Sequence, residues 1–241
     1  TVADYILDRL RAWGVAHVFA FPGDGINGML AVTQRLEQSA LSNTAGLQAM
    51  LTELQTLRGQ LKDQSGRELA VPPRAQLDYP DGPNICSPTS IAMLLAFWHA
   101  RTGDARLAPF AEPRAVADLA CPLVYDPTYE GHGNWAFNTA LAASYGLRAH
   151  VARLGSLAEL GAWIAAGVPM AISVAWQPGQ LDGAPIEASR GHLLVVAGFD
   201  AAGDVIVADP RGDTPAEVRR VYRAAQLERA WQHSSGTTYL A

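Results

Sequence analysis

The sequence of 241 residues contains only two cysteines, Cys86 and Cys121, too few for a protein held together by several disulfides. No C-x-x-C pair is present, so the usual cysteine spacing of a zinc site is also missing. A single bridge between the two cysteines stays open, because pairing depends on their distance in the fold. Each thiol is otherwise either a small buried hydrophobe or a reactive group.

Positive charge and long apolar runs are scarce as well. Lys62 is the only lysine and the net charge is −5, so the composition gives no electrostatic reason to expect a nucleic-acid partner. No segment reaches the roughly 18 apolar residues of a membrane span. The first residues are acidic and amphipathic, unlike a secretory signal. We expect a protein that is soluble as given. Its compartment and oligomeric state stay unknown, and secretion would require a signal that has been removed.

What is present is a globular composition, with 49% hydrophobic and 17% charged residues, arranged in three zones. Residues 1–38 have the pattern of a helix, a buried strand, a Gly-rich turn and a second helix. Residues 39–69 carry leucines at spacings of three and four, which predicts an amphipathic linker helix. Residues 70–241 should form one domain of the α+β class, because helix patterns come first and strand patterns follow.

The elements expected within residues 70–241 are as follows. Helix patterns lie near 87–100, 113–119, 134–145 and 156–166. Strand patterns lie at 168–174, 192–197, 205–208 and 237–240, and residues 200–204 form a hairpin turn between two of them. Short turns join antiparallel strands, so we expect helices packed on an antiparallel sheet.

Cys86 stands at the start of the first of these helices. Pro88 favours a helix beginning at this point, since proline is tolerated in the first turn. Backbone N–H groups without partners and the helix dipole favour a thiolate over a thiol there. Cys86 is therefore a candidate nucleophile, and a buried apolar filler is the alternative interpretation.

A nucleophilic thiol needs a base and a group that orients the base. His192 begins an apolar strand after Gly191, which places it at the rim of the sheet. Asp209 ends the next strand, where its carboxylate could hold one imidazole nitrogen. A structural histidine and an Asp-Pro turn are the plainer interpretations of these two residues. Gln76 could donate an amide hydrogen bond to the developing oxyanion, beside the backbone N–H of Cys86.

These stretches together make residues 70–241 resemble papain-like cysteine peptidases of the bacteriocin-processing, double-glycine type, in their stand-alone bacterial branch. The matching segments are 71–76, 86–90, 133–140, 191–196 and 205–210, and residues 221–231 resemble the end of the family's domain. The resemblance implies a papain-like fold, peptide or protein substrates and no cofactor.

The resemblance also assigns roles. Cys86 would be the nucleophile and His192 the general base and acid. Asp209 would orient the imidazole, and Gln76 would complete the oxyanion hole. Many relatives have glycine after the nucleophile, so the bulkier Ser87 is expected to narrow the site.

The substrate cleft has candidate residues too. Trp135 and Asn138 are expected to contact the substrate, with Phe137 beside them. Packing in the core is the other interpretation of the two aromatic side chains.

Residues 1–38, above all the stretch 1–28, resemble the beginning of thiamine-diphosphate enzymes such as pyruvate oxidases and acetolactate synthases. The glutamate that activates the cofactor and the diphosphate motif of those enzymes have no counterpart here, so no cofactor residue is assigned. Three alternatives to peptide hydrolysis stay open. They are acyl or amide transfer on the same residues, peptide binding by a degenerate site, and, least favoured, activity of a thiamine-diphosphate enzyme fragment.

Overall fold

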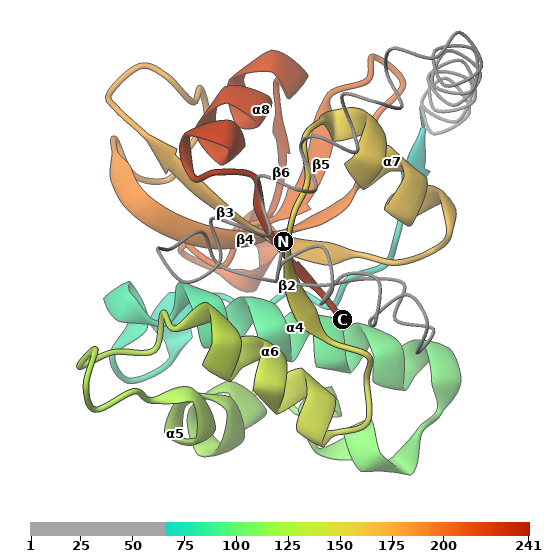
Figure 1. Ribbon diagram of the computed structural model, residues 1–241, viewed down its shortest axis with the longest axis vertical. Coiled ribbons are helices and arrows are strands. Elements are labelled where there is room, and N and C mark those ends of the chain that lie inside the picture. The colour runs from blue at the N-terminus through green and yellow to red at the C-terminus, as the bar shows by residue number, and fades with distance from the viewer. Residues whose placement is uncertain (1–65) are drawn as a thin grey trace, which may run out of the picture. The chain divides into compact units, whose positions relative to one another are not determined.

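The computed structural model describes residues 66–241, so the interpretation of residues 1–38 and that of the linker helix 39–69 up to residue 65 lie outside this part of the chain. The helix predicted for 39–69 does not extend over its last residues, because residues 67–68 form a strand that pairs with the main sheet. Elements carry the labels of Figure 1. The described chain starts with a short strand, β1 (Arg67–Glu68), and continues as an extended stretch. Two 3-10 turns, Gln76–Asp78 and Gly82–Asn84, then lead into the first long helix.

That helix, α4 (Cys86–Thr102), is the centre of the domain. Its residues 87–97 are all buried, as expected of a helix that is apolar around most of its circumference. It ends at Gly103, whose positive φ of 67° allows its N–H to donate back to the carbonyl of His99. The helix predicted for residues 87–100 is confirmed, and Cys86 is its first residue.

The other helices are shorter. They are α5 (Cys121–Val124), α6 (Trp135–Ser144), α7 (Leu157–Ala165) and α8 (Ala224–His233). Side-chain caps fix the starts of two of them. Asn134 accepts the N–H groups of Ala136 and Phe137 before α6, and Ser156 accepts that of Glu159 before α7.

Within residues 66–241, seven strands form one antiparallel sheet. After β1 come β2 (His150–Arg153), β3 (Met170–Trp176), β4 (Ser189–Phe199), β5 (Val205–Ala208), β6 (Arg219–Tyr222) and β7 (Thr237–Leu240). The order across the sheet is β2-β7-β3-β4-β5-β6, and β1 pairs with β4 outside this path. The last strand of the chain therefore lies inside the sheet, between β2 and β3.

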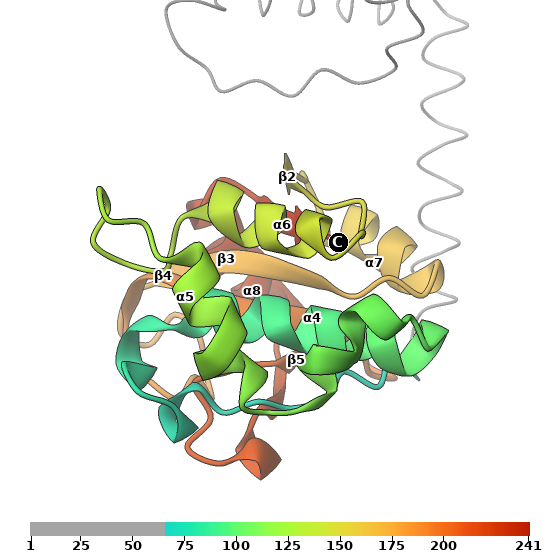
Figure 2. The ribbon, with the colours of Figure 1, turned by 90° about the horizontal axis from the view of Figure 1, so that it is seen from below.

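Helices cover both faces of this sheet (Figure 1). One cluster of buried side chains joins α4 and α6 to the face that presents Leu193 and Val195. A second cluster joins α7 and α8 to the face that presents Leu194 and Val196. Figure 2 shows α4 lying beside α6 in the first of these layers. Because β4 is covered on both sides, it reads as a continuous apolar run instead of an alternating one.

The α+β class and the packing of helices on an antiparallel sheet are thus confirmed. The strands predicted at 205–208 and 237–240 have those bounds, and α6 and α7 match their predicted ranges to within one residue at each end. The helix expected at 113–119 is wrong in type, because a π-helical turn at Val116–Ala120 precedes the short α5. In residues 66–241 we find no helix that is both long and apolar enough to cross a membrane.

Candidate active site

Cys86 is the first residue of α4 and is only partly buried. The preceding residue, Ile85, has no side-chain cap; its carbonyl instead accepts the N–H of Thr89 at 3.1 Å and the Thr89 hydroxyl at 2.7 Å. An α-helix leaves the N–H groups of its first turn without intrahelical acceptors. The thiol therefore lies at a helix start, where amide donors and the helix dipole favour negative charge.

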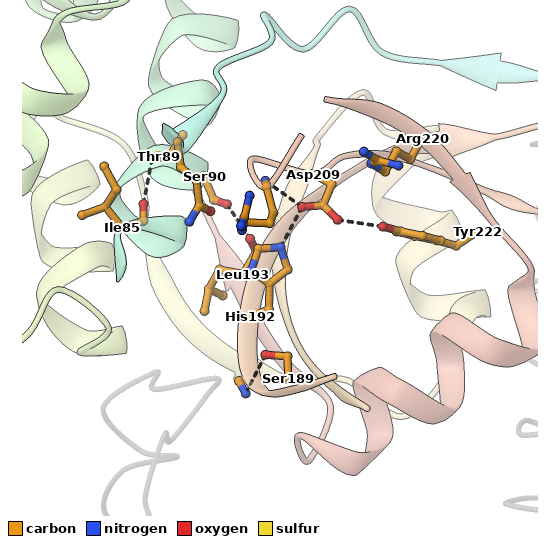
Figure 3. Close-up of polar contacts among 12 residues, drawn as sticks. Ile85, Thr89, Ser90, Ser189, His192, Leu193, Asp209, Arg220 and Tyr222 are labelled. Atoms are coloured by element: carbon orange, nitrogen blue, oxygen red, sulfur yellow. Dashed lines mark hydrogen bonds and ion pairs between the residues drawn. The ribbon is translucent and has the colours of Figure 1, made fainter. Parts of the chain in front are cut away.

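His192 is the fourth residue of β4 and is buried, so the prediction that it begins its strand at the rim of the sheet is wrong. Strand β4 packs against this helix start. The hydroxyl of Ser90 donates to the carbonyl of Leu193 at 3.1 Å, which fixes the strand to the first turns of α4 (Figure 3). The pairing of β3 with β4 shifts between Val174, opposite His192, and Trp176, opposite Ser189. A bulge of this kind bends a strand and redirects its side chains, and this one lies directly before His192 in β4.

The imidazole of His192 is held by Asp209, which directly follows β5. Its Nε2–H donates to Oδ1 of Asp209 at 2.7 Å, and both side chains are buried, with 4% and 0% of the residue exposed. The same carboxylate oxygen accepts the backbone N–H of Arg211 at 2.9 Å, and Oδ2 accepts the hydroxyl of Tyr222 at 2.7 Å (Figure 3). Trp176 packs edge-on to the imidazole, with 6.0 Å between ring centroids.

The electrostatics of the group favour a thiolate and an imidazolium. Burial would raise the pKa of Cys86, but a hydrogen bond with His192, the charge of that ring and the backbone N–H of Leu193 outweigh it and lower the pKa. Burial would likewise lower the pKa of His192, yet the charge and hydrogen bond of Asp209 and the contact with Cys86 raise it to about 10. Since Nε2 is bound to Asp209, the hydrogen bond to sulfur falls to Nδ1.

Gln76 makes hydrogen bonds to the segment after Asp209 and to the turn before Cys86. Its backbone N–H donates to the carbonyl of Pro210 at 2.7 Å, directly after Asp209. Its side-chain amide donates to the carbonyl of Gly82, in the turn before Cys86. A Cβ at Gly82 would lie 2.8 Å from the Gln76 carbonyl oxygen, so the close approach of the two turns requires glycine. The Oε1 atom of Gln76 is buried and has no hydrogen-bond partner.

Ser87 does not extend into open space. Only 1% of it is exposed, and its hydroxyl lies 2.9 Å from the hydroxyl of Tyr239 on the internal strand β7. The expectation that Ser87 narrows the site is therefore not supported by where the side chain lies. The pair instead fixes the start of α4 to the sheet beneath it.

The two candidate substrate contacts lie in different surroundings. Trp135 lines a pocket of about 500 Å³ together with Asp126, Thr128, Tyr129, Gly133 and Asn134. Asn138 is fully buried, and its amide donates to the carbonyls of His132 and Asn134 at 2.8 Å. The contacts of Asn138 therefore stabilise the loop before α6, which forms part of the pocket wall.

Two residues that contact the His192–Asp209 pair were missed by reasoning from the sequence: Tyr222, which donates to Asp209, and Trp176, which packs on the imidazole. Tyr222 ends β6, a strand that was not predicted because two exposed or half-exposed arginines interrupt its apolar alternation. Trp176 was placed beyond the predicted end of β3. An aromatic residue at a strand end was the only available signal for either. Among residues 66–241, no group of three or more His, Cys, Asp or Glu side chains could hold a metal ion.

The chain is similar to known proteins in sequence and in fold. A search of curated proteins gives no significant match. Among solved structures, a chain from Bacillus anthracis described as a C39-like peptidase is 18% identical, with a TM-score of 0.46, over 70% of this chain and 93% of that one. Xylellain, a cysteine protease from Xylella fastidiosa, is 12% identical, with a TM-score of 0.39, over 65% of this chain and 78% of that one.

Both TM-scores lie below 0.5, so the assignment of the family depends on the sequence model alone. The model of the Peptidase C39 like family matches residues 68–239, which is most of the chain and nearly all of the part described above. The chain therefore belongs to the Peptidase C39 like family and is a cysteine-type peptidase that acts on peptides.

Proposed function

We propose that this peptidase hydrolyses peptide bonds with Cys86 as the nucleophile and His192 as the general base and acid, oriented by Asp209. The observation that carries the proposal is the 2.7 Å hydrogen bond from Nε2 of His192 to the buried Asp209 carboxylate. With that nitrogen occupied, the opposite nitrogen of the same ring is left for the thiol at the start of α4.

The first half of the reaction forms a thioester. The Cys86 thiolate attacks the carbonyl carbon of the scissile bond, and the electron pair of the carbonyl moves onto oxygen to give a tetrahedral intermediate. When the intermediate collapses, the C–N bond breaks. The His192 imidazolium gives its proton to the departing nitrogen, so the amine product leaves neutral and the ring becomes a base.

The second half releases the acid. His192 takes a proton from water as the water oxygen attacks the thioester carbonyl. The C–S bond then breaks, which restores the thiolate and leaves the new carboxyl group on the product. Asp209 holds the ring in one orientation throughout and stabilises the imidazolium, without taking up a proton itself.

The developing oxyanion would be bound by two donors. One is the backbone N–H of Cys86, which has no acceptor within the helix. The other is the second hydrogen of the Gln76 side-chain amide, whose first hydrogen is bound to Gly82. The bond from the Gln76 backbone to Pro210 supports this role, because it ties the donor to the segment that carries the Asp209 carboxylate.

The pocket that Trp135 lines is the proposed place for a substrate side chain. Trp135 and Cys86 both pack against the buried cluster that joins α4 and α6 to the sheet, which supports a position of the pocket on the same side of the sheet as the start of α4. Trp135 would contact the substrate directly. Asn138 would act through the loop that it holds in place.

The experiment that tests the proposal compares the two cysteines. Cys86→Ala should abolish cleavage of a peptide library, whereas Cys121→Ala should leave cleavage close to that of the unaltered protein. Burial raises the pKa of Cys121 to about 11, so it is a matched thiol of low reactivity. Cleavage that survives in the Cys86→Ala variant would refute the proposal. Adding an amine acceptor to the same assay separates hydrolysis from acyl transfer, because transfer would yield the amide of the acceptor.

A further inference from the structure

Tyr222 donates a hydrogen bond to the carboxylate that orients His192. Only 1% of Tyr222 is exposed, and its hydroxyl lies 2.7 Å from Oδ2 of Asp209. The other oxygen, Oδ1, accepts from Nε2 of His192 and from the backbone N–H of Arg211. Each oxygen is thus held from a different side, and Tyr222 is the one donor to Oδ2 that the described residues provide.

The strand register explains why this tyrosine meets this carboxylate. Tyr222 pairs with Val205 across β5 and β6, and Val205 belongs to the buried cluster on the α8 face of the sheet. Side chains two residues apart in a strand share a face, so Val207 and the following Asp209 continue on the same face as Val205. The phenol therefore extends along that face to the end of β5, where the carboxylate lies.

The phenol can act only as a donor here. A carboxylate accepts hydrogen bonds and has no hydrogen to give. Burial, together with the charge of Asp209, raises the pKa of Tyr222 far above its usual range. Tyr222 therefore keeps its proton at every pH at which the enzyme could work, and it takes no part in proton transfer.

We propose that Tyr222 is a positioning residue, which holds the carboxylate of Asp209 so that Oδ1 faces Nε2 of His192. The proposal depends on the proposed function, because it assigns Tyr222 an effect on the reaction through the imidazole. Tyr222 is packed in the cluster under α8 with Leu227 and Trp231, so its hydroxyl is a rigid reference point. The packing of side chains under α8 therefore determines, through Tyr222 and Asp209, the orientation of the His192 imidazole.

Loss of the hydroxyl has a definite consequence. In a Tyr222→Phe variant, Oδ2 of Asp209 would be buried without a donor, which is costly for a charged oxygen. The carboxylate would either rotate toward its remaining donors or take up a proton. Both changes reduce the electrostatic stabilisation of the His192 imidazolium by Asp209. Because the imidazolium stabilises the Cys86 thiolate, the pKa of Cys86 should rise.

The test measures the thiolate directly, so that it does not depend on peptide cleavage. In a Cys121→Ala background, Cys86 is the only thiol, and its rate of alkylation by iodoacetamide is followed against pH. For Tyr222→Phe we expect the low-pH midpoint of alkylation to rise by about 0.5–1 unit and kcat on a peptide to fall about 10-fold, with KM unchanged. We also expect the high-pH limb of kcat/KM to move to lower pH.

A matched control removes another buried hydroxyl. Ser173 lies in β3, is buried, and its hydroxyl is 2.7 Å from that of Ser234. Ser173→Ala should lower the melting temperature without moving either pH midpoint. If Tyr222→Phe behaves in the same way, its role is structural only and the proposal is overturned. The proposal would also be overturned if the low-pH midpoint moved down and the high-pH limb moved up. The hydroxyl would then act only by dispersing the negative charge of the carboxylate.

A second comparison covers the case in which the unpaired charge of Asp209 prevents Tyr222→Phe from folding, because Asp209→Asn removes that charge. Asp209→Asn and Asp209→Asn/Tyr222→Phe are compared by the same alkylation profile. If Tyr222 acts through Asp209, adding Tyr222→Phe should change nothing once the carboxylate is gone. A further shift would show that Tyr222 acts by another route. Since alkylation can be measured on a protein that cleaves no peptide, failure of this proposal is distinct from failure of the proposed function.

Discussion

The backbone N–H of Gln76 donates to the carbonyl of Pro210 at 2.7 Å, which joins two segments that are far apart in the sequence. Gln76 is the proposed oxyanion donor, and Pro210 follows the proposed orienting residue, Asp209. The bond therefore links the side of the site that would stabilise the oxyanion to the side that would orient the imidazole. A donor placed by a backbone bond of this kind needs no reorganisation during the reaction.

The first prediction follows from this arrangement. Gln76→Ala should lower kcat for peptide hydrolysis by about 10²–10³-fold, with a smaller effect on KM, because the donor acts on charge that develops only in the transition state. Steady-state kinetics measure the effect. Gln226→Ala, which removes an amide on the exposed side of α8, is the control. A loss of only a few-fold for Gln76→Ala would rule out a role for its amide in binding the oxyanion.

The second prediction concerns the pH dependence of the unaltered enzyme. The lowered pKa of Cys86 means that the thiolate forms at a pH below the usual range of a thiol. The pKa of His192, raised to about 10, means that the imidazolium keeps its proton until well above neutral pH. The kcat/KM profile should therefore rise on the acid side with thiolate formation and fall only near pH 10. An alkaline limb close to pH 6.5 would contradict the close pairing of His192 with Asp209.

The third prediction removes the charge of that partner. In Asp209→Asn, the amide oxygen can still accept the Nε2 proton, but the negative charge that stabilises the imidazolium is gone. The alkaline limb of kcat/KM should move down by about 1–3 pH units. Asp213→Asn changes a well-exposed carboxylate of the same loop and should leave the limb in place. Equal limbs in both variants would mean that the charge of Asp209 has no influence on the ring.

The sequence alone indicates residues that stand near a proline or glycine at the edge of an apolar run. Cys86 precedes a proline in a helix start, His192 begins an apolar run after a glycine, and Asp209 ends another run before a proline. Each position can be recognised within a few neighbouring residues. That local information was enough to name Cys86, His192 and Asp209 as candidates, whose roles stay a proposal. The α+β class followed from the order of helix and strand patterns along the chain.

What could not be predicted depends on the pairing of distant strands. The bulge opposite Trp176, the position of Tyr222 beside Asp209 and the burial of Ser87 all follow from register across the sheet. No local pattern encodes a register between segments that are separated by helices or long loops. Asn138 is a similar case. The sequence predicts that it lies in a helix, but it does not predict its hydrogen bonds to the preceding loop.

The last prediction concerns Ser87 and Tyr239, whose hydroxyl groups share a buried hydrogen bond. Ser87→Ala should leave the phenol of Tyr239 without a partner and lower the free energy of unfolding by about 1–3 kcal/mol. Tyr239→Phe should have a similar cost. The double variant should cost less than the sum of the two, because it leaves no unpaired group.

Denaturant unfolding of the four proteins measures this coupling. Additive losses would show that the two hydroxyls do not interact. Kinetics on the same proteins test the expected effect of Ser87 on the width of the site. Because the side chain faces the sheet, replacing it with a smaller residue opens no space for the substrate, and KM for peptides with bulky residues should stay the same. A lower KM in Ser87→Ala would mean that the side chain faces the substrate after all.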